Sequence, residues 1–267
     1  MKVLVIGAGN MGLTYAEGMS KSKRLNNENI MILDKSEEKL RELRQIPHFD
    51  AFEEFKDCVP KADIIFIAVK PYHSDSLFEE IKPLLNTNQM AVSVMAGVTI
   101  ETISKGTGLS KVVRAMPNLP AQIGQGLTSF IATPEVTNEE AEIVEDLLNT
   151  TGKSIQVASE RFIDASTGIS GSGPAYVFYF MQSMMEAATK MGFSKGDATL
   201  LVSQTFKGAV ELFNEYDLTP KEWMGRVASK GGTTQAALDS LDSNNVNRLI
   251  QEAAFAAFDR AVELGKQ

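Results

Sequence analysis

The sequence predicts an α/β protein in two parts: a doubly wound sheet over residues 1–158 and an all-helical domain over residues 159–267. Three observations lead to this prediction. Short apolar runs alternate with amphipathic segments through the first half of the chain. A glycine-rich turn follows the first apolar run. After residue 159 the runs of strand type cease, and segments with helical periodicity continue to the C-terminus.

The predicted strands are short apolar runs bounded by polar residues, proline or glycine. They cover residues 2–6, 30–33, 64–68, 90–94, 111–115 and 127–132. The predicted helices between them cover residues 13–20, 37–44, 77–85, 100–105 and 138–148. This alternation is typical of a parallel sheet with crossover helices on both faces.

The predicted helices of the second part cover residues 161–169, 174–190, 195–216, 219–228 and 246–264, with a further helix opening at Thr233. Gly171 and Gly173 separate the first two of these helices, and Pro174 stands at the start of the second, where proline is tolerated. The last helix carries alanines and phenylalanines on most sides over residues 253–258, which predicts burial on more than one side. We therefore favour helices that interleave with a second copy of the chain over a self-contained bundle.

Composition excludes several classes of protein. The net charge of −8, without a cluster of basic residues, argues against nucleic-acid or anionic membrane partners. Apolar runs such as residues 64–69 are far too short to span a membrane. Cys58 is the only cysteine, so the chain has neither an internal disulfide nor a cysteine-based metal cluster. We expect a cytoplasmic protein that requires no metal.

The glycine turn reads Gly7-Ala8-Gly9-Asn10-Met11-Gly12 and lies between the first strand and the first helix. In such a turn the first glycine permits a tight bend, the second lets a pyrophosphate approach the backbone, and the third lets the helix pack on the strand. The flanking strand and helix make this a prediction of a dinucleotide site rather than of a glycine-rich surface turn.

Asp34 closes the second strand about twenty residues beyond the turn, where an acidic side chain accepts hydrogen bonds from ribose hydroxyls. A carboxylate there repels the extra phosphate of NADP, which favours NADH, although Lys35 and Ser36 follow at once and soften that repulsion. Asp34 as an ordinary turn residue is the alternative.

Three further segments end strands at the carboxyl edge of the sheet, where ligands of doubly wound folds bind. They are Ala68-Val69-Lys70-Pro71, Ala96-Gly97, and Met116-Pro117-Asn118. Lys70 either faces the coenzyme or is simply solvated. The other two segments are candidates to line the nicotinamide.

The loop Ser229-Lys230-Gly231-Gly232-Thr233-Thr234 opens a helix with two glycines, three hydroxyls and a run of amides. Such a loop forms an anion nest that holds a carboxylate without an arginine, or else it is a plain linker between helices.

Histidine is scarce: the chain has only His48 and His73, neither in the helical domain. An enzyme that oxidises an alcohol needs a base for the hydroxyl proton, whereas an enzyme that reduces an imine receives a substrate with a basic nitrogen. The small number of histidines therefore favours imine reduction.

Taken together, these segments resemble the pyrroline-5-carboxylate reductase family over almost the whole chain. The resemblance rests on the glycine turn, on Ala68-Val-Lys-Pro71, on Arg114-Ala-Met-Pro-Asn118, on Ile169-Ser-Gly-Ser-Gly-Pro-Ala-Tyr176 and on Ala228-Ser-Lys-Gly-Gly-Thr-Thr234. It implies an N-terminal Rossmann domain for NADPH or NADH, and a C-terminal dimerisation domain whose homodimers often build larger homo-oligomers.

The resemblance also implies roles for single residues. Ser229 and Thr234 are the implied catalytic residues, and the Thr234 hydroxyl approaches the ring nitrogen. Ser229 and the amides around Thr233 and Thr234 grip the carboxylate of pyrroline-5-carboxylate, which is reduced to proline, and Gly231 and Gly232 of the same loop also bind the substrate. The turn from Gly171 through Gly173 to Pro174 shapes the floor of the substrate site.

The chain departs from the family pattern at three places: Lys230 replaces a common proline, Leu119 replaces a common threonine, and Asp34-Lys35 stands where NADPH users tend to have small polar or Asn-Arg residues.

Two alternative functions remain. A β-hydroxyacid dehydrogenase needs a lysine soon after the glycines of its helical domain, and none follows Gly171 before Lys190. A regulatory module would keep the fold without the chemistry. Assembly size, regulation and activity on related cyclic imines stay open.

Overall fold

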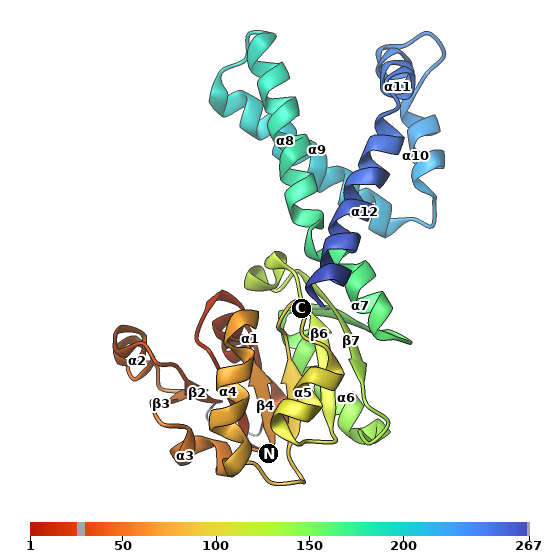
Figure 1. Cartoon of the computed structure of the whole chain (residues 1–267). Helices are drawn as coiled ribbons and strands as arrows, with labels where there is room; N and C mark the ends of the chain where they lie inside the picture. Colours follow the sequence, from red (N-terminus) through yellow and green to blue (C-terminus); the bar gives the residue numbers. More distant parts are fainter. Residues whose placement is uncertain (26–29, 266–267) are drawn as a thin grey trace. The chain divides into compact units, whose positions relative to one another are not determined.

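The computed structural model describes residues 1–25 and 30–265. Compactness divides the chain into two units, Met1–Ser172 with Ala256–Gln267 and Gly173–Phe255. The first unit is built on a single sheet of eight strands (Figure 1). Its strands are β1 (Val3–Ile6), β2 (Ile30–Leu33), β3 (Phe49–Phe52), β4 (Ile64–Ile67), β5 (Met90–Ser93), β6 (Val112–Met116), β7 (Gly126–Ala132) and β8 (Gly152–Gln156).

The strand order is β3-β2-β1-β4-β5-β6-β7-β8, and every neighbouring pair is parallel except β6 with β7. The order in which successive strands are added to the sheet reverses at β1, since β2 and β3 lie on one side of β1 and β4 lies on the other. Doubly wound sheets bind their ligands at the carboxyl edge of such a switch point. The antiparallel β7 follows from its connection, because residues 117–125 hold only a short 3₁₀ turn and a parallel crossover needs a dozen or more residues.

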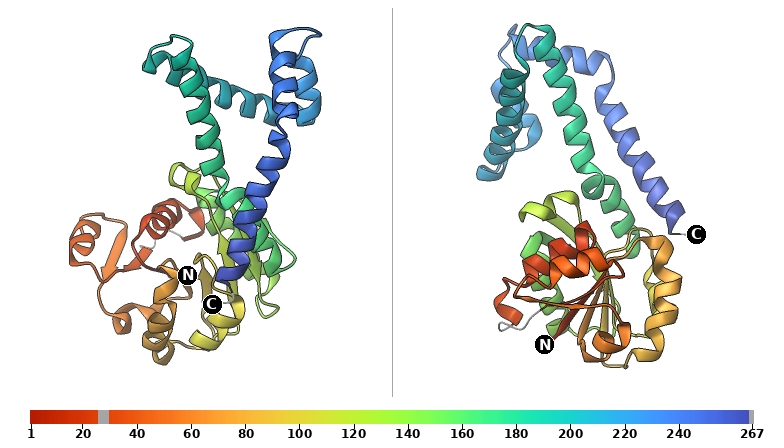
Figure 2. Two further views of the ribbon diagram at one scale, coloured as in Figure 1. Left: turned by 45° about the horizontal axis from the view of Figure 1, so that its top comes forward. Right: turned by 90° about the vertical axis from the view of Figure 1, so that its left-hand side faces the viewer.

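Helices cover both faces of this sheet (Figure 2). Residues of α1, α2 and α6 join the core on one face, and residues of α3, α4 and α5 join the core on the other. Their bounds are α1 (Asn10–Met19), α2 (Glu37–Leu43), α3 (Phe55–Cys58), α4 (Ser74–Ile81), α5 (Ile100–Thr107) and α6 (Asn138–Leu148). The fold class predicted from the sequence is confirmed.

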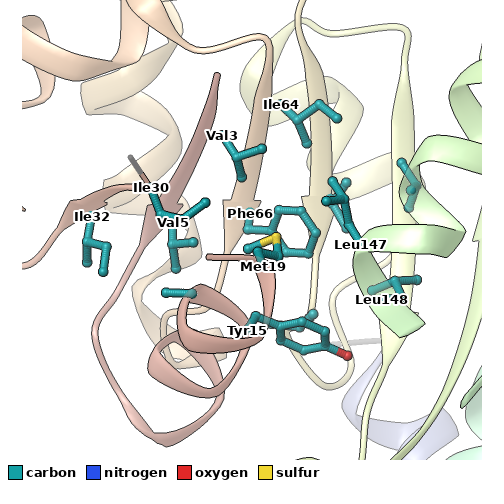
Figure 3. Packing of buried hydrophobic residues seen from close by; sticks show 14 of the residues in the cluster. Val3, Val5, Tyr15, Met19, Ile30, Ile32, Ile64, Phe66, Leu147 and Leu148 are labelled. Atoms are coloured by element: carbon teal, nitrogen blue, oxygen red, sulfur yellow. The ribbon is translucent and has the colours of Figure 1, made fainter. Parts of the chain in front are cut away.

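The period-two alternation of the strands assigns their side chains to the two cores. In β1, Val3 and Val5 belong to one core while Leu4 and Ile6 belong to the other. Figure 3 shows the first core, in which Val5 and Phe66 of the sheet face Tyr15 and Met19 of α1, with Leu147 and Leu148 of α6 beside them. Both faces of the central strands are therefore dry, which explains their uninterrupted apolar runs.

The second unit is helical. It contains α8 (Gly173–Lys190), α9 (Lys195–Glu215), α10 (Pro220–Val227), α11 (Thr233–Ser243) and the first part of α12 (Val246–Leu264). Helices α8 and α9 pack against each other. Among its described residues only Ala198 and Val202 are buried hydrophobics, while aromatic residues such as Phe178, Tyr179 and Phe255 are more than half exposed. The unit therefore presents apolar helix faces that a single chain leaves uncovered.

The predicted boundary after residue 158 separates a coenzyme-binding domain from a dimerisation domain, and it stays a prediction. The division into compact units falls after residue 172, because α7 (Glu160–Ser166) packs on β6 and β7 within the first unit.

Several predicted elements need correction. Strands β3 and β8 were not predicted. Both lie at an edge of the sheet, so β3 has one buried residue, Phe49, and β8 has one large apolar side chain. Gly171 does not break the helix, since residues Thr167–Gly171 form a π-helical turn between α7 and α8. The first helix begins at Asn10 rather than at residue 13. Within the described residues, no helix is long and apolar enough to cross a membrane.

Candidate coenzyme and substrate sites

The glycine turn joins β1 to α1 in a conformation that needs its glycines. Gly7 has a φ of +100°, and a Cβ there would lie 3.0 Å from the Ala68 carbonyl oxygen. A Cβ at Gly12 would lie 1.9 Å from the Gly7 carbonyl oxygen, so only glycine lets α1 start so close to the turn. These are the steric roles that the sequence predicted for both positions.

Gly9 has a different environment. It precedes the first residue of α1, no side chain caps the helix there, and a Cβ at this position would meet no atom within 4 Å. The first amides of an α-helix have no partner within the helix, and no side chain caps them here. Free amides at a helix N-terminus fit the pyrophosphate of a dinucleotide.

A cavity of about 350 Å³ lies at the carboxyl edge of the sheet beside this turn. Of the predicted coenzyme residues it is lined by Gly7, Gly9, Asp34, Lys35, Ala68, Val69 and Lys70. Four further residues that were not predicted from the sequence line it too: Lys39 of α2, Phe55 of α3, and His73 and Glu80 of the segment after β4. Their places depend on how α2, α3 and α4 pack on the sheet, for which the sequence contains no local signal.

Asp34 is held in place by backbone amides. Its Oδ2 accepts a hydrogen bond from the Ala8 amide at 2.7 Å, and its Oδ1 accepts one from the Ser36 amide at 2.8 Å. The carboxylate thus links the end of β2 to the glycine turn. A carboxylate has about four acceptor sites, so these two bonds leave capacity for ribose hydroxyls.

The remaining predicted coenzyme residues do not line this cavity. Asn10 and Met11 are the first two residues of α1, and Pro71 opens a 3₁₀ turn (Pro71–His73). Ala96 and Gly97 follow β5, and Gly97 has a φ of +77° with Leu264 of α12 3.1 Å from where its Cβ would be. Close approach of α12 is thus a packing reason for this glycine.

Asn118 makes structural contacts. Its side-chain amide donates to the Ser170 carbonyl oxygen at 3.1 Å, and its Oδ1 accepts from the Leu127 amide at 2.9 Å. Gly171 lies against Met116 of β6, since a Cβ there would come within 3.1 Å of the Met116 side chain. Asn118 therefore fastens β7 and the π-helical turn together, and its contact with a coenzyme stays a prediction.

The predicted carboxylate loop lies in the second unit. The Gly232 amide donates to the Ser229 carbonyl oxygen at 2.9 Å, Gly231 has a φ of +74°, and Lys230 has no positive φ. This is the pattern of a type II turn, in which proline or another residue at the second position and glycine at the third are accommodated. Lys230 therefore keeps the backbone form that the family's proline favours.

The loop leads into α11 without a capping side chain. Gly232 precedes the helix, and a Cβ there would lie 2.4 Å from Ser229 Oγ. Thr233 and Thr234 are the first residues of the helix, which has no acidic residue in its first turn. Free amides, the Ser229 hydroxyl and two threonine hydroxyls thus occur together, as an anion nest requires.

The predicted residues fall into two groups. The coenzyme residues and Gly171 belong to the first unit, whereas Gly173, Pro174 and the loop from Ser229 to Thr234 belong to the second. Gly173 and Pro174 form the start of α8. Within the described residues, no group of three or more metal-ligating side chains lies together.

Known proteins match the chain over its full length. Residues 160–264 match the family model for pyrroline-5-carboxylate reductase dimerisation, and residues 2–97 match the model for NADP oxidoreductase, coenzyme F420-dependent. A pyrroline-5-carboxylate reductase of Pseudomonas aeruginosa is 33% identical over 100% of this chain and 97% of its own.

Solved structures agree. The pyrroline-5-carboxylate reductase of Coxiella burnetii has a TM-score of 0.92 at 32% identity, covering 100% of this chain and 99% of that one. A pyrroline carboxylate reductase of Plasmodium falciparum, solved with NADP bound, has a TM-score of 0.87 at 29% identity and covers 99% and 98% of the two chains. The chain, with its glycine turn and its helix-opening serine and threonine loop, belongs to the pyrroline-5-carboxylate reductase family.

Proposed function

We propose that this protein reduces 1-pyrroline-5-carboxylate to L-proline, the final step of proline biosynthesis, with a hydride from NADPH or NADH. The observation that carries the proposal is the coexistence, in one chain of this family, of two helix starts that no side chain caps. One lies beside the open space at Gly9, and the other follows the Ser229 loop.

The two predicted domains divide the work. Residues 1–158 hold the coenzyme, with the amides around Gly9 on its pyrophosphate and Asp34 near its ribose. Residues 159–267 dimerise and bind the substrate. When bound, the coenzyme supplies the hydride that reduces C5 of the cyclic imine.

The residues of the loop orient the imine. The amides that follow Gly231 and the Ser229 hydroxyl hold the substrate carboxylate, and the Thr234 hydroxyl hydrogen-bonds the ring nitrogen. The imine nitrogen is basic and arrives protonated, so the chain needs no histidine base there. Gly171, Gly173 and Pro174 shape the pocket around the ring.

The exposed helices of the second unit and the match to a dimerisation domain make the chain a subunit of a homo-oligomer. We propose that dimers associate into larger rings and that the enzyme works in the cytoplasm.

Initial rates of NADH and NADPH oxidation by the purified protein, with and without pyrroline-5-carboxylate, test the function. Turnover that depends on the imine supports it and ranks the two coenzymes. Coenzyme binding without turnover would contradict it and would favour a regulatory protein or a different substrate.

A further inference from the structure

Five charged side chains line the coenzyme cavity, and four of them form two ion pairs. Asp34 and Lys35 follow β2, Lys39 belongs to α2, and Glu80 belongs to α4; the fifth, Lys70, follows β4. Asp34 and Lys35 are the residues that the sequence predicts to influence the choice between NADH and NADPH. Lys39 and Glu80 come from helices that the fold brings to the same cavity.

The four charges form two pairs. Lys35 Nζ lies 2.6 Å from Glu80 Oε1, and Lys39 Nζ lies 3.6 Å from Asp34 Oδ2. A ribose 2′-phosphate needs a cation nearby. In this arrangement each of the two lysines already has a carboxylate partner, and the formal charges of the four groups cancel.

The Lys35–Glu80 pair has little importance for folding. Its side chains are 69% and 44% exposed, and exposed pairs contribute at most about 1 kcal/mol to stability. Lys35 Nζ also lies 5.4 Å from the centre of the Phe55 ring, which lines the same cavity. The ammonium is thus kept at the cavity by Glu80 on one helix and Phe55 on another.

We propose that Glu80 is a coenzyme-selecting residue: by pairing with Lys35 it withholds one of the cations that a 2′-phosphate would use, and together with Asp34 it makes the chain prefer NADH. The inference rests on the proposed function only in that the cavity takes a nicotinamide dinucleotide. Asp34 acts as a fixed negative charge, because two backbone amides hold it, and Glu80 acts through the lysine that it occupies.

Fluorescence titration of the purified full chain with NADH and with NADPH, without imine, tests this. The unmodified chain should bind NADH more tightly. Glu80→Gln frees Lys35 and should tighten NADPH binding about threefold, a factor in the range of an exposed ion pair, with NADH binding changed less than about twofold. Glu79→Gln is the matched control, because Glu79 is exposed on the same helix and does not line the cavity.

A second variant identifies the mediator. In the background of Glu80→Gln, Lys35→Ala should remove the gain in NADPH affinity. The inference is overturned by tighter NADPH binding in the unmodified chain, by no gain in Glu80→Gln, by an equal gain in Glu79→Gln, or by a gain that survives loss of Lys35. Because no imine is present, these outcomes are separate from the proposed function, which fails when coenzyme binds and the imine is not reduced.

The same titration tests Asp34. Asp34→Ser removes the fixed charge and should raise the ratio of NADPH to NADH affinity about tenfold, and Asp34→Ser with Glu80→Gln should raise it further. An unchanged ratio in the single variant would remove Asp34 as a selector.

Discussion

At the residue scale, the hydroxyl of Thr234 has the most specific predicted role. Thr234→Ala removes one hydrogen bond to the ring nitrogen and should lower kcat/KM at least about tenfold, equivalent to about 1.4 kcal/mol, without changing the affinity for NADH. Thr234→Ser keeps the hydroxyl and should retain most of the activity. Steady-state kinetics of both variants measure this, and unaltered kinetics in the alanine variant would exclude Thr234 from the mechanism.

Two glycines of the same turn are expected to respond differently to alanine. At Gly9 the added methyl meets no protein atom but occupies the space for the pyrophosphate, so Gly9→Ala should leave the thermal unfolding midpoint unchanged and weaken coenzyme binding about tenfold. At Gly12 the methyl collides with the Gly7 carbonyl, so Gly12→Ala should lose about 2 kcal/mol of stability. Calorimetry and coenzyme titration separate the two effects. Equal losses of stability would contradict the assignment.

At the scale of elements, a buried arginine connects the sheet to α7. Arg114 of β6 is 2% exposed and lies 2.8 Å from Glu160 and 2.7 Å from Asp164, while Glu160 also accepts from the Ile100 amide at the start of α5. Arg114→Met leaves these carboxylates without their cation and should cost about 3 kcal/mol of unfolding free energy.

The exposed pair of Arg24 and Asp146 provides the comparison. These side chains are 52% and 44% exposed, so Arg24→Met should cost less than about 1 kcal/mol. Urea denaturation of both variants measures the difference. A loss at Arg114 no larger than the loss at Arg24 would show that the buried pairs do not hold α7 on the sheet.

Elements with strong local signals were predicted well. The helix over Asn138–Leu148 has the predicted bounds, because Thr137 and Glu140 form a capping box and an apolar stripe follows. The helix over Val246–Leu264 also has the predicted bounds. In contrast, β8 was not predicted, because four of its five residues are glycine or polar and give no apolar pattern. It forms because it pairs with β7 in the sheet.

At the scale of the whole molecule, the second unit buries too few side chains within one chain to be stable with its apolar helix faces exposed to water. Phe255 is 63% exposed on α12, in the region that matches a dimerisation domain. Phe255→Asp places a charge in the expected interface and should shift the protein toward single chains of 29.1 kDa. Sedimentation velocity measures the shift.

Tyr72→Asp is the control for this variant. Tyr72 is 79% exposed and lies outside the matched region, so the same change there should leave the oligomer intact. If both variants keep the mass of the unmodified protein, Phe255 lies outside the subunit contacts.

The sequence by itself determined the α/β class, the glycine turn, Asp34 at the end of β2 and the helix-opening loop at Ser229. Each of these depends on residues close together in the chain: a strand period, a cap, or a φ that only glycine adopts readily. The tertiary structure alone decided that Glu80 meets Lys35, that Asn118 joins β7 to the π-helical turn, and that Arg114 holds α7. The contacts Lys35–Glu80, Arg114–Asp164 and Asn118–Ser170 join residues 45 to 52 positions apart, so they arise only when helices pack on a completed sheet.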